Sequence, residues 1–163
     1  MLLHPHPDMG GNRFNNVVDA LYRALPSAGI TALRFDFSSS DIATARAETI
    51  AALTLVEDAS RFLVGYSFGG GVAAAIADEQ VAGHVLIAPA ITMIPPAVGA
   101  DPRPKLVLAA EHDQFFAPDA IADATNGWTN LELATISGAD HFFGGRTDAV
   151  ATAVLDWFRR AAP

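Results

Sequence analysis

The sequence predicts an α/β fold, a three-layer αβα sandwich on a mostly parallel sheet of about six strands. Short apolar runs alternate with helical stretches along the whole chain, which is typical of a parallel sheet with helices on both faces. Hydrophobic residues make up 51% of the chain and charged residues only 17%, so a buried core is expected. No repeat, linker or low-complexity tract divides residues 1–163, which indicates a single domain.

The elements follow from the apolar periodicity and from the Gly and Pro residues between them. The expected strands are Met1–His4, Ile30–Phe37, Arg61–Tyr66, Gly83–Ala88, Lys105–Ala110 and Asn130–Ile136. The expected helices are Arg13–Leu25, Ile42–Glu57, Phe68–Ala77, Pro118–Ala124 and Thr147–Arg160.

In the first half of the chain, local signals justify each boundary. The first strand stops at His4–Pro7, where two prolines cannot continue a hydrogen-bonded ladder. The apolar residues of the next helix recur every three or four positions. The second strand alternates apolar and polar residues over Leu33–Phe37, which favours an edge of the sheet over its centre. Asp41 then caps the second helix.

In the second half, apolar strands alternate with shorter helices. The third strand, Arg61–Tyr66, leads directly into a helix of small residues. The fourth, with Val85–Ile87 at its centre, is followed by the proline-rich connection Pro89–Pro104, which is too short for a folded lid. Pro118 starts a helix after the fifth strand, since proline suits the first helical position. The helix after the sixth strand has apolar residues on one face and two arginines near its C-terminal end.

The turn between the third strand and its helix reads Gly65-Tyr66-Ser67-Phe68-Gly69. The spacing Gly-x-Ser-x-Gly is typical of a nucleophile elbow, in which a strand turns sharply into a helix and exposes a serine hydroxyl. Glycines two residues before and after the serine leave room for its strained backbone. Ser67 is therefore the candidate nucleophile.

An acid and a base are expected beside this serine. Asp113 follows the fifth strand and His141 follows the sixth, and the carboxyl ends of parallel strands meet at one rim of the sheet. His141 can take the serine proton and later donate it to a leaving group, and Asp113 can hold the ring in the required tautomer. Glu111 and His112 compete with Asp113 for the third position.

The negative oxygen that forms on attack needs two N–H donors. One is the amide of Phe68, directly after the candidate nucleophile, and the other is expected in the loop after the first strand. In that loop we favour His6, with Met9 second. A metal site made by His4, His6 and His112 is disfavoured, because no set of three ligands has convincing spacing.

Aromatic residues flank the candidate acid and base. Phe115, Phe142 and Phe143 are the candidate substrate-binding residues, as an apolar wall for an acyl group. The alternative is that these rings pack in the core.

These motifs together resemble the α/β-hydrolase superfamily, within it the small intracellular, dienelactone-hydrolase-like branch. The similarity rests on segments spread over nearly the whole chain, namely His4–Gly11, Arg34–Phe37, Gly65–Gly70, His112–Asp113 and Gly138–Phe143. The resemblance implies a serine hydrolase with Ser67, Asp113 and His141 as its triad and with no cofactor. Dienelactone hydrolases proper carry cysteine where this chain has Ser67, so their lactone substrate is not carried over.

The chain departs from that family in two ways. Family members usually have one or two strands before the His-Pro loop and often a cap domain. This chain resembles either a reduced fold or one shortened at its N-terminus, without a cap. The strand Ile30–Phe37 is then an exposed edge, which makes a homodimer through this edge a candidate assembly.

The amino-acid composition limits the kinds of binding partner that are expected. The net charge of −8 disfavours nucleic-acid binding. No cysteine is present, which excludes disulfides and thiolate catalysis, and no signal peptide or membrane-spanning run is visible, so a cytoplasmic protein is expected. The predicted function is hydrolysis of a small acyl substrate such as an ester. The alternatives are a non-catalytic binding or scaffold protein on the same fold, and an acyltransferase or peptidase with the same residues.

Overall fold

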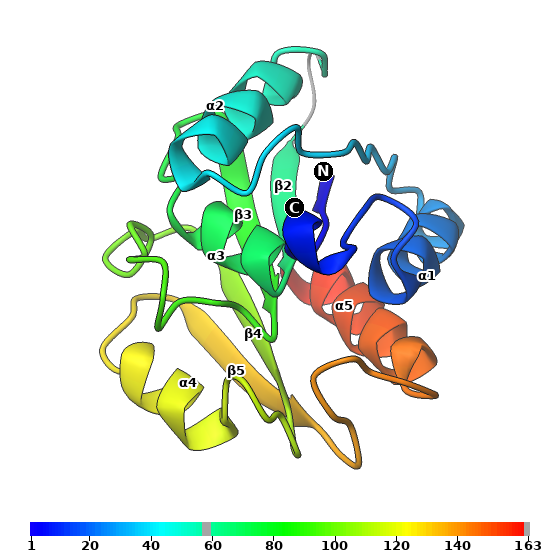
Figure 1. The fold of residues 1–163 in the computed structure, drawn as a ribbon. Helices are drawn as coiled ribbons and strands as arrows, with labels where there is room; N and C mark the ends of the chain where they lie inside the picture. The colour runs from blue at the N-terminus through cyan, green and yellow to red at the C-terminus, as the bar shows by residue number, and fades with distance from the viewer. Residues whose placement is uncertain (57–59, 162–163) are drawn as a thin grey trace.

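The computed structural model describes residues 1–56 and 60–161, which fold into three layers (Figure 1). In the described residues, five parallel strands form one sheet in the spatial order β1-β2-β3-β4-β5. The strands are β1 (Leu2–Leu3), β2 (Arg61–Tyr66), β3 (Val81–Ile87), β4 (Lys105–Ala110) and β5 (Leu131–Ile136). The helices are α1 (Asn16–Ala24), α2 (Ile42–Leu53), α3 (Phe68–Ala74), α4 (Pro118–Ala124) and α5 (Thr147–Ala161).

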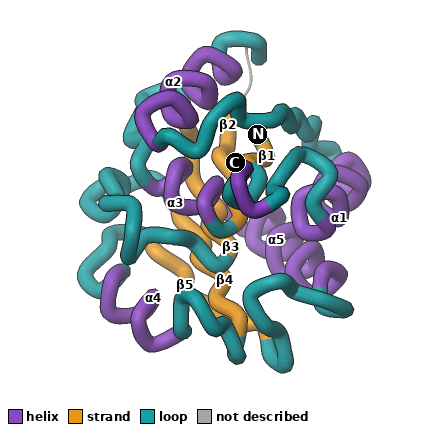
Figure 2. The backbone as a smooth tube through the Cα atoms, viewed as in Figure 1, coloured by secondary structure: helices purple, strands orange, loops and turns teal. Residues whose placement is uncertain are grey.

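The sheet separates two apolar cores, because successive residues of a strand point to opposite faces. In β4, Leu106 and Leu108 pack with α1 and α5, whereas Val107 faces the core formed with α2, α3 and α4. Figure 2 shows the strands as the middle layer with helices to both sides. The predicted α/β sandwich is thereby confirmed.

The predicted strand Ile30–Phe37 is not part of this sheet. Its one ladder contact in the described residues is a parallel bridge between Arg34 and Leu2, which places the segment beside β1, at the edge where it was expected. Strand β1 has only two residues and offers few backbone groups for pairing. Arg34 instead forms an ion pair with Asp19 of α1 at 2.9 Å. The sheet therefore has five strands rather than about six, and the homodimer through this edge stays a prediction.

Several helix boundaries also differ from the sequence prediction, and α3, for example, ends at Ala74 rather than at Ala77. Helix α1 begins after Asn15 rather than at Arg13, because the side-chain oxygen of Asn15 accepts a hydrogen bond from the amide of Val17 and caps the helix. Helix α2 ends at Leu53, and its predicted end at Glu57 lies outside the described residues.

The carboxyl ends of β2, β4 and β5 meet at one rim of the sheet, and the loops after them carry the candidate site. The connection Pro89–Pro104 contains no helix or strand, so it forms no folded lid. Among the residues described here, no helix combines the length and apolar character needed to cross a membrane.

Candidate active site

Ser67 occupies a strained turn between β2 and α3. Its φ and ψ angles are 55° and −115°, a backbone conformation that residues with a side chain rarely adopt. The flanking glycines make the turn fit. A Cβ atom on Gly65 would lie 2.2 Å from the carbonyl oxygen of Gly69, and one on Gly69 would lie 2.5 Å from that of Leu3. The glycine spacing predicted from the sequence thus has a direct steric cause.

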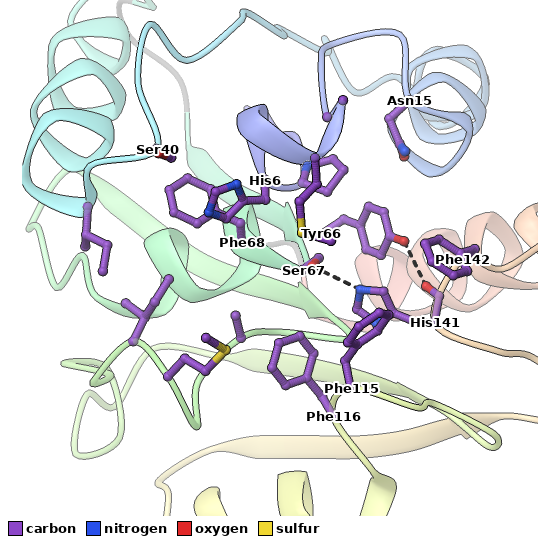
Figure 3. Close-up of a pocket in the computed structure, with 18 residues that line it drawn as sticks. His6, Asn15, Ser40, Tyr66, Ser67, Phe68, Phe115, Phe116, His141 and Phe142 are labelled. Carbon is purple, nitrogen blue, oxygen red and sulfur yellow. Dashed lines mark hydrogen bonds between the residues drawn. The ribbon is translucent and has the colours of Figure 1, made fainter.

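The structure brings Ser67, His141 and Asp113 into one hydrogen-bonded chain. Ser67 Oγ lies 3.0 Å from His141 Nε2 (Figure 3), and His141 Nδ1 lies 2.8 Å from Asp113 Oδ2. An ionised carboxylate only accepts hydrogen bonds, so Nδ1 carries the proton and Nε2 is left to accept one from the serine hydroxyl. All three residues are buried, which limits the water that could interrupt the chain.

The environment of Asp113 keeps it ionised. Burial alone raises the pKa of the carboxyl, but hydrogen bonds from His141 and from the amides of Phe116 and Phe115 outweigh burial and hold the pKa below its usual range. Both amides donate to Oδ1 at 2.8 Å, while Oδ2 faces the histidine. Asp113 is therefore a fixed negative charge aimed at the His141 ring.

The competing residues of the same loop point elsewhere. Glu111 accepts hydrogen bonds from the Ser137 hydroxyl at 2.9 Å and from the Gly138 amide at 2.6 Å, and so supports the turn before His141. The side chain of His112 is largely exposed. Of these three residues, Asp113 is the one whose side chain hydrogen-bonds to the His141 ring in the described structure.

Tyr66 positions the histidine loop, a role that sequence reasoning missed. Its hydroxyl donates to the backbone oxygen of His141 at 2.8 Å, and the two rings lie 5.6 Å apart (Figure 3). Burial raises the pKa of the Tyr66 phenol well above its usual value, and the negative charge of Asp113 adds to the shift. The hydroxyl therefore stays protonated as a donor. Its partner is a backbone atom, so no residue pattern signals the contact.

The candidate oxyanion donors differ in availability. In the described part of the chain, the amides of Phe68 and His6 donate no hydrogen bond. The amide of Met9 is occupied, since it donates to the backbone oxygen of His6 at 3.1 Å within a short 3₁₀ turn. This hydrogen bond leaves the Met9 amide less available than that of His6, although Met9 lines the cavity, and its place as second candidate stays a prediction.

A cavity of about 510 Å³ opens above Ser67. Its walls come from the loop after β1, the start of α2, the connection after β3 and the loops that carry Asp113 and His141. Among the described residues, no lysine, arginine, aspartate or glutamate lines it. The lining residues are mostly apolar or aromatic: Pro5, His6, Met9, Gly10, Gly11, Asn15, Ser40, Ile42, Tyr66, Ser67, Phe68, Ala90, Met93, Ile94, Phe115, Phe116, His141 and Phe142.

The three predicted wall residues separate into two groups. Phe115 and Phe142 line the cavity and are about half exposed. Phe143 is fully buried among core residues, 6.0 Å from the Tyr66 ring. Its φ of 52° turns the chain sharply after Phe142, so the two neighbouring rings point to different places. Contrary to the expectation, Phe143 does not line the cavity.

His4 has a structural position. Its Nδ1 lies 2.6 Å from the backbone oxygen of Pro5, and its Nε2 accepts a hydrogen bond from the Phe37 amide at 2.9 Å. The buried ring thus joins the loop after β1 to the edge segment. In the parts of the chain that the structure describes, no group of three or more His, Asp or Glu side chains could hold a metal ion.

Comparison with known proteins gives matches over nearly the whole chain. A model of the alpha/beta hydrolase family matches residues 5–163. An uncharacterized protein of Rickettsia prowazekii (strain Madrid E) is 27% identical, over 96% of this chain and 76% of its own length.

Solved structures are similar over a comparable range. An alpha-beta serine hydrolase homologue from Coxiella burnetii is 26% identical with a TM-score of 0.84, and the match covers 95% of this chain and 82% of that one. An alpha/beta serine hydrolase without a lid from Xanthomonas campestris is 24% identical, and this similarity concerns the fold. Its TM-score is 0.79, with coverage of 98% of this chain and 79% of that one.

Proposed function

The chain belongs to the alpha/beta hydrolase family, and from its site we propose a serine hydrolase that cleaves small esters or related acyl compounds. The observation that carries the proposal is the unbroken chain of hydrogen bonds from the Ser67 hydroxyl through His141 to Asp113. A hydroxyl, an imidazole and a carboxylate linked in this order are the parts of a nucleophilic triad.

The proposed reaction has two steps. In the first, His141 takes the proton of Ser67 while Oγ attacks the substrate carbonyl carbon. The tetrahedral intermediate then loses the alcohol, which receives the proton from Nε2, and the acyl group stays on Ser67. In the second step His141 activates a water molecule, which releases the acid and restores the serine. Asp113 stabilises the imidazolium that forms in each step.

Two backbone amides are proposed to stabilise the negative oxygen. The amide of Phe68 stands at the start of α3, where a helix has no internal acceptor for it. The amide of His6 is the second donor, because it has no acceptor among the described residues, unlike that of Met9. Such preorganised donors typically contribute about 10²–10³ in rate each.

The cavity lining supports an uncharged substrate. With no cationic side chain among the described lining residues and a net charge of −8 on the chain, a carboxylate-bearing substrate would find no partner. Membership of the dienelactone-hydrolase-like branch stays a prediction, and its lactone is not part of this proposal.

The test uses Ser67→Ala with a fluorophosphonate probe and p-nitrophenyl acetate. We expect the native protein to be labelled and to release p-nitrophenol, and Ser67→Ala to lose both. The matched control is Ser27→Ala, whose hydroxyl donates to Ala24 on the surface, far along the chain from the site. Labelling of Ser67→Ala at the native level would reject the proposal.

A further inference from the structure

We propose that Phe115 and Phe142, on one side of the cavity, bind the alcohol part of the ester, while Ile42, Met93 and Ile94 on the other side bind the acyl part. This inference rests on the proposed function and deepens it by assigning each wall to one half of the substrate. It predicts esters that combine an aryl or arylalkyl alcohol with an aliphatic acid.

The two sides belong to different layers of the fold. Phe142 lies on the α1 side, where its backbone oxygen accepts a hydrogen bond from the Asn16 side chain at 2.9 Å. Ile94 lies on the opposite side, against α3, because a Cβ atom on Gly71 would lie 2.7 Å from its side chain. Ser67 stands between them, at the rim where the two layers meet.

The side proposed for the acyl part is formed by the start of α2 and the connection after β3, and two further cavity-lining rings, Phe68 and Phe116, belong to the same core as Ile94. Ile42 is the first residue of α2, and Met93 and Ile94 come from the connection. Met93 is 74% exposed, and its flexible side chain can adapt to acyl chains of different length. Dispersion and burial of apolar surface are the only attractions these three side chains offer, which suits an aliphatic chain.

Proton transfer decides which half of the ester lies on which side. When the tetrahedral intermediate breaks, the bond between the carbonyl carbon and the alcohol oxygen is cleaved, and the electron pair stays with that oxygen. His141 Nε2 donates its proton there, so the alcohol oxygen must lie within hydrogen-bond reach of Nε2. The carbonyl oxygen points to the amides of Phe68 and His6 at the same time. The acyl chain then extends away from His141.

Aromatic rings lie next to the proposed position of the alcohol, beside His141 Nε2. The rings of Phe115 and Phe142 lie 4.9 and 5.7 Å from the His141 ring, nearly perpendicular to it (Figure 3). They also pack edge to face with each other at 6.1 Å. Both remain about half exposed toward the cavity. A planar group next to Nε2 can stack or pack edge to face with these rings, which favours an aromatic alcohol.

Acylation and deacylation separate the two sides experimentally, because the alcohol has already left when deacylation begins. We compare Phe142→Ala with Met93→Ala, two exposed lining residues on opposite sides. Rapid-mixing kinetics with phenyl, benzyl and ethyl acetate, and with p-nitrophenyl acetate and hexanoate, give both rate constants. Phe142→Leu serves as a second variant that keeps bulk but not the ring, and thermal melting checks that each variant folds.

We expect the variants on the two sides to affect different reaction steps and different substrates. Phe142→Ala should slow acylation by phenyl and benzyl acetate by roughly tenfold, which corresponds to the interaction free energy of about one aromatic pair. Acylation by ethyl acetate, whose alcohol has no ring, and deacylation should be slowed clearly less than acylation by phenyl and benzyl acetate. Phe142→Leu should behave like Phe142→Ala. Met93→Ala should slow both steps for hexanoate more than for acetate.

The failures of the two proposals are distinguishable. If native protein shows neither a burst of p-nitrophenol nor labelling by a fluorophosphonate, the proposed serine hydrolase is wrong. If the burst is present but Phe142→Ala slows deacylation as much as acylation, Phe142 acts through His141 and the assignment of sides is overturned. A change in acyl-chain preference in Phe142→Ala would overturn it as well.

Discussion

Replacing Tyr66 with phenylalanine tests whether its hydroxyl positions the histidine loop. The ring and its packing against Phe143 remain, and only the 2.8 Å hydrogen bond to the backbone oxygen of His141 is lost. A buried oxygen that loses its donor costs about 1–3 kcal/mol. For a domain of this size, each kcal/mol lowers the melting temperature by roughly 2–4 °C, so a fall of about 2–12 °C is expected.

The same change should lower activity. Without the bond, the loop that carries His141 can shift relative to Ser67, and a misplaced general base slows both reaction steps. We expect kcat to fall about tenfold with little change in KM, because the hydroxyl faces the loop backbone. Steady-state kinetics on p-nitrophenyl acetate and thermal melting measure the two effects.

Tyr22 supplies the matched control, as the only other tyrosine of the chain. It lies on α1, is 38% exposed, and its ring packs against the Arg34 guanidinium, a contact that phenylalanine keeps. Tyr22→Phe should therefore melt and turn over like the native protein. Equal behaviour of Tyr66→Phe and Tyr22→Phe in both assays would refute the positioning role.

Three further changes test other parts of the account. Asp113→Asn should keep the fold but lower kcat by about 10⁴, because an amide in place of the carboxylate traps the wrong histidine tautomer, and a loss below tenfold would move the acid elsewhere. Gly65→Ala should destabilise by about 3 kcal/mol or more, since the new Cβ would lie 2.2 Å from the Gly69 carbonyl oxygen. Its control, Gly144→Ala, meets no atom within 4 Å and should change the unfolding free energy by less than about 0.5 kcal/mol. Burial lowers the pKa of His84 from 6.5 to about 4, so the unfolded chain binds more protons between these values. The free energy of unfolding should therefore be highest above pH 6.5 and fall by about 3 kcal/mol as the pH is lowered to 4, because of His84. Urea titrations at several pH values should show a weaker pH dependence of this free energy for His84→Gln.

The sequence carried enough information to locate Ser67, Asp113 and His141 because each depends on local signals. The glycines around Ser67 mark the strained turn, and the other two residues follow directly after apolar strands that had to be parallel. Parallel strands bring such loops to one rim whatever the details of packing. The order of the strands along the chain was therefore enough to predict that Ser67, Asp113 and His141 lie close together.

Features that depend on a distant partner could not be predicted in the same way. The segment Ile30–Phe37 has a strand-like pattern, but pairing also needs a neighbour of sufficient length, and β1 has only two residues. Phe142 and Phe143 look equivalent in the sequence, yet the left-handed backbone of Phe143 sends one ring to the cavity and the other to the core. The Tyr66 contact joins residues 75 positions apart, and its acceptor is a backbone atom.

Detection of the acyl group on Ser67 is the strictest test of the proposed hydrolase mechanism. Asp113→Asn protein is mixed with p-nitrophenyl acetate, quenched in acid within the first turnover, digested and examined by tandem mass spectrometry. We expect an acetyl group on Ser67, in the peptide that contains Gly65 and Gly69, and none at this site in Ser67→Ala. Release of p-nitrophenol with no acetyl group on Ser67, or with acetylation confined to another residue, would contradict this mechanism.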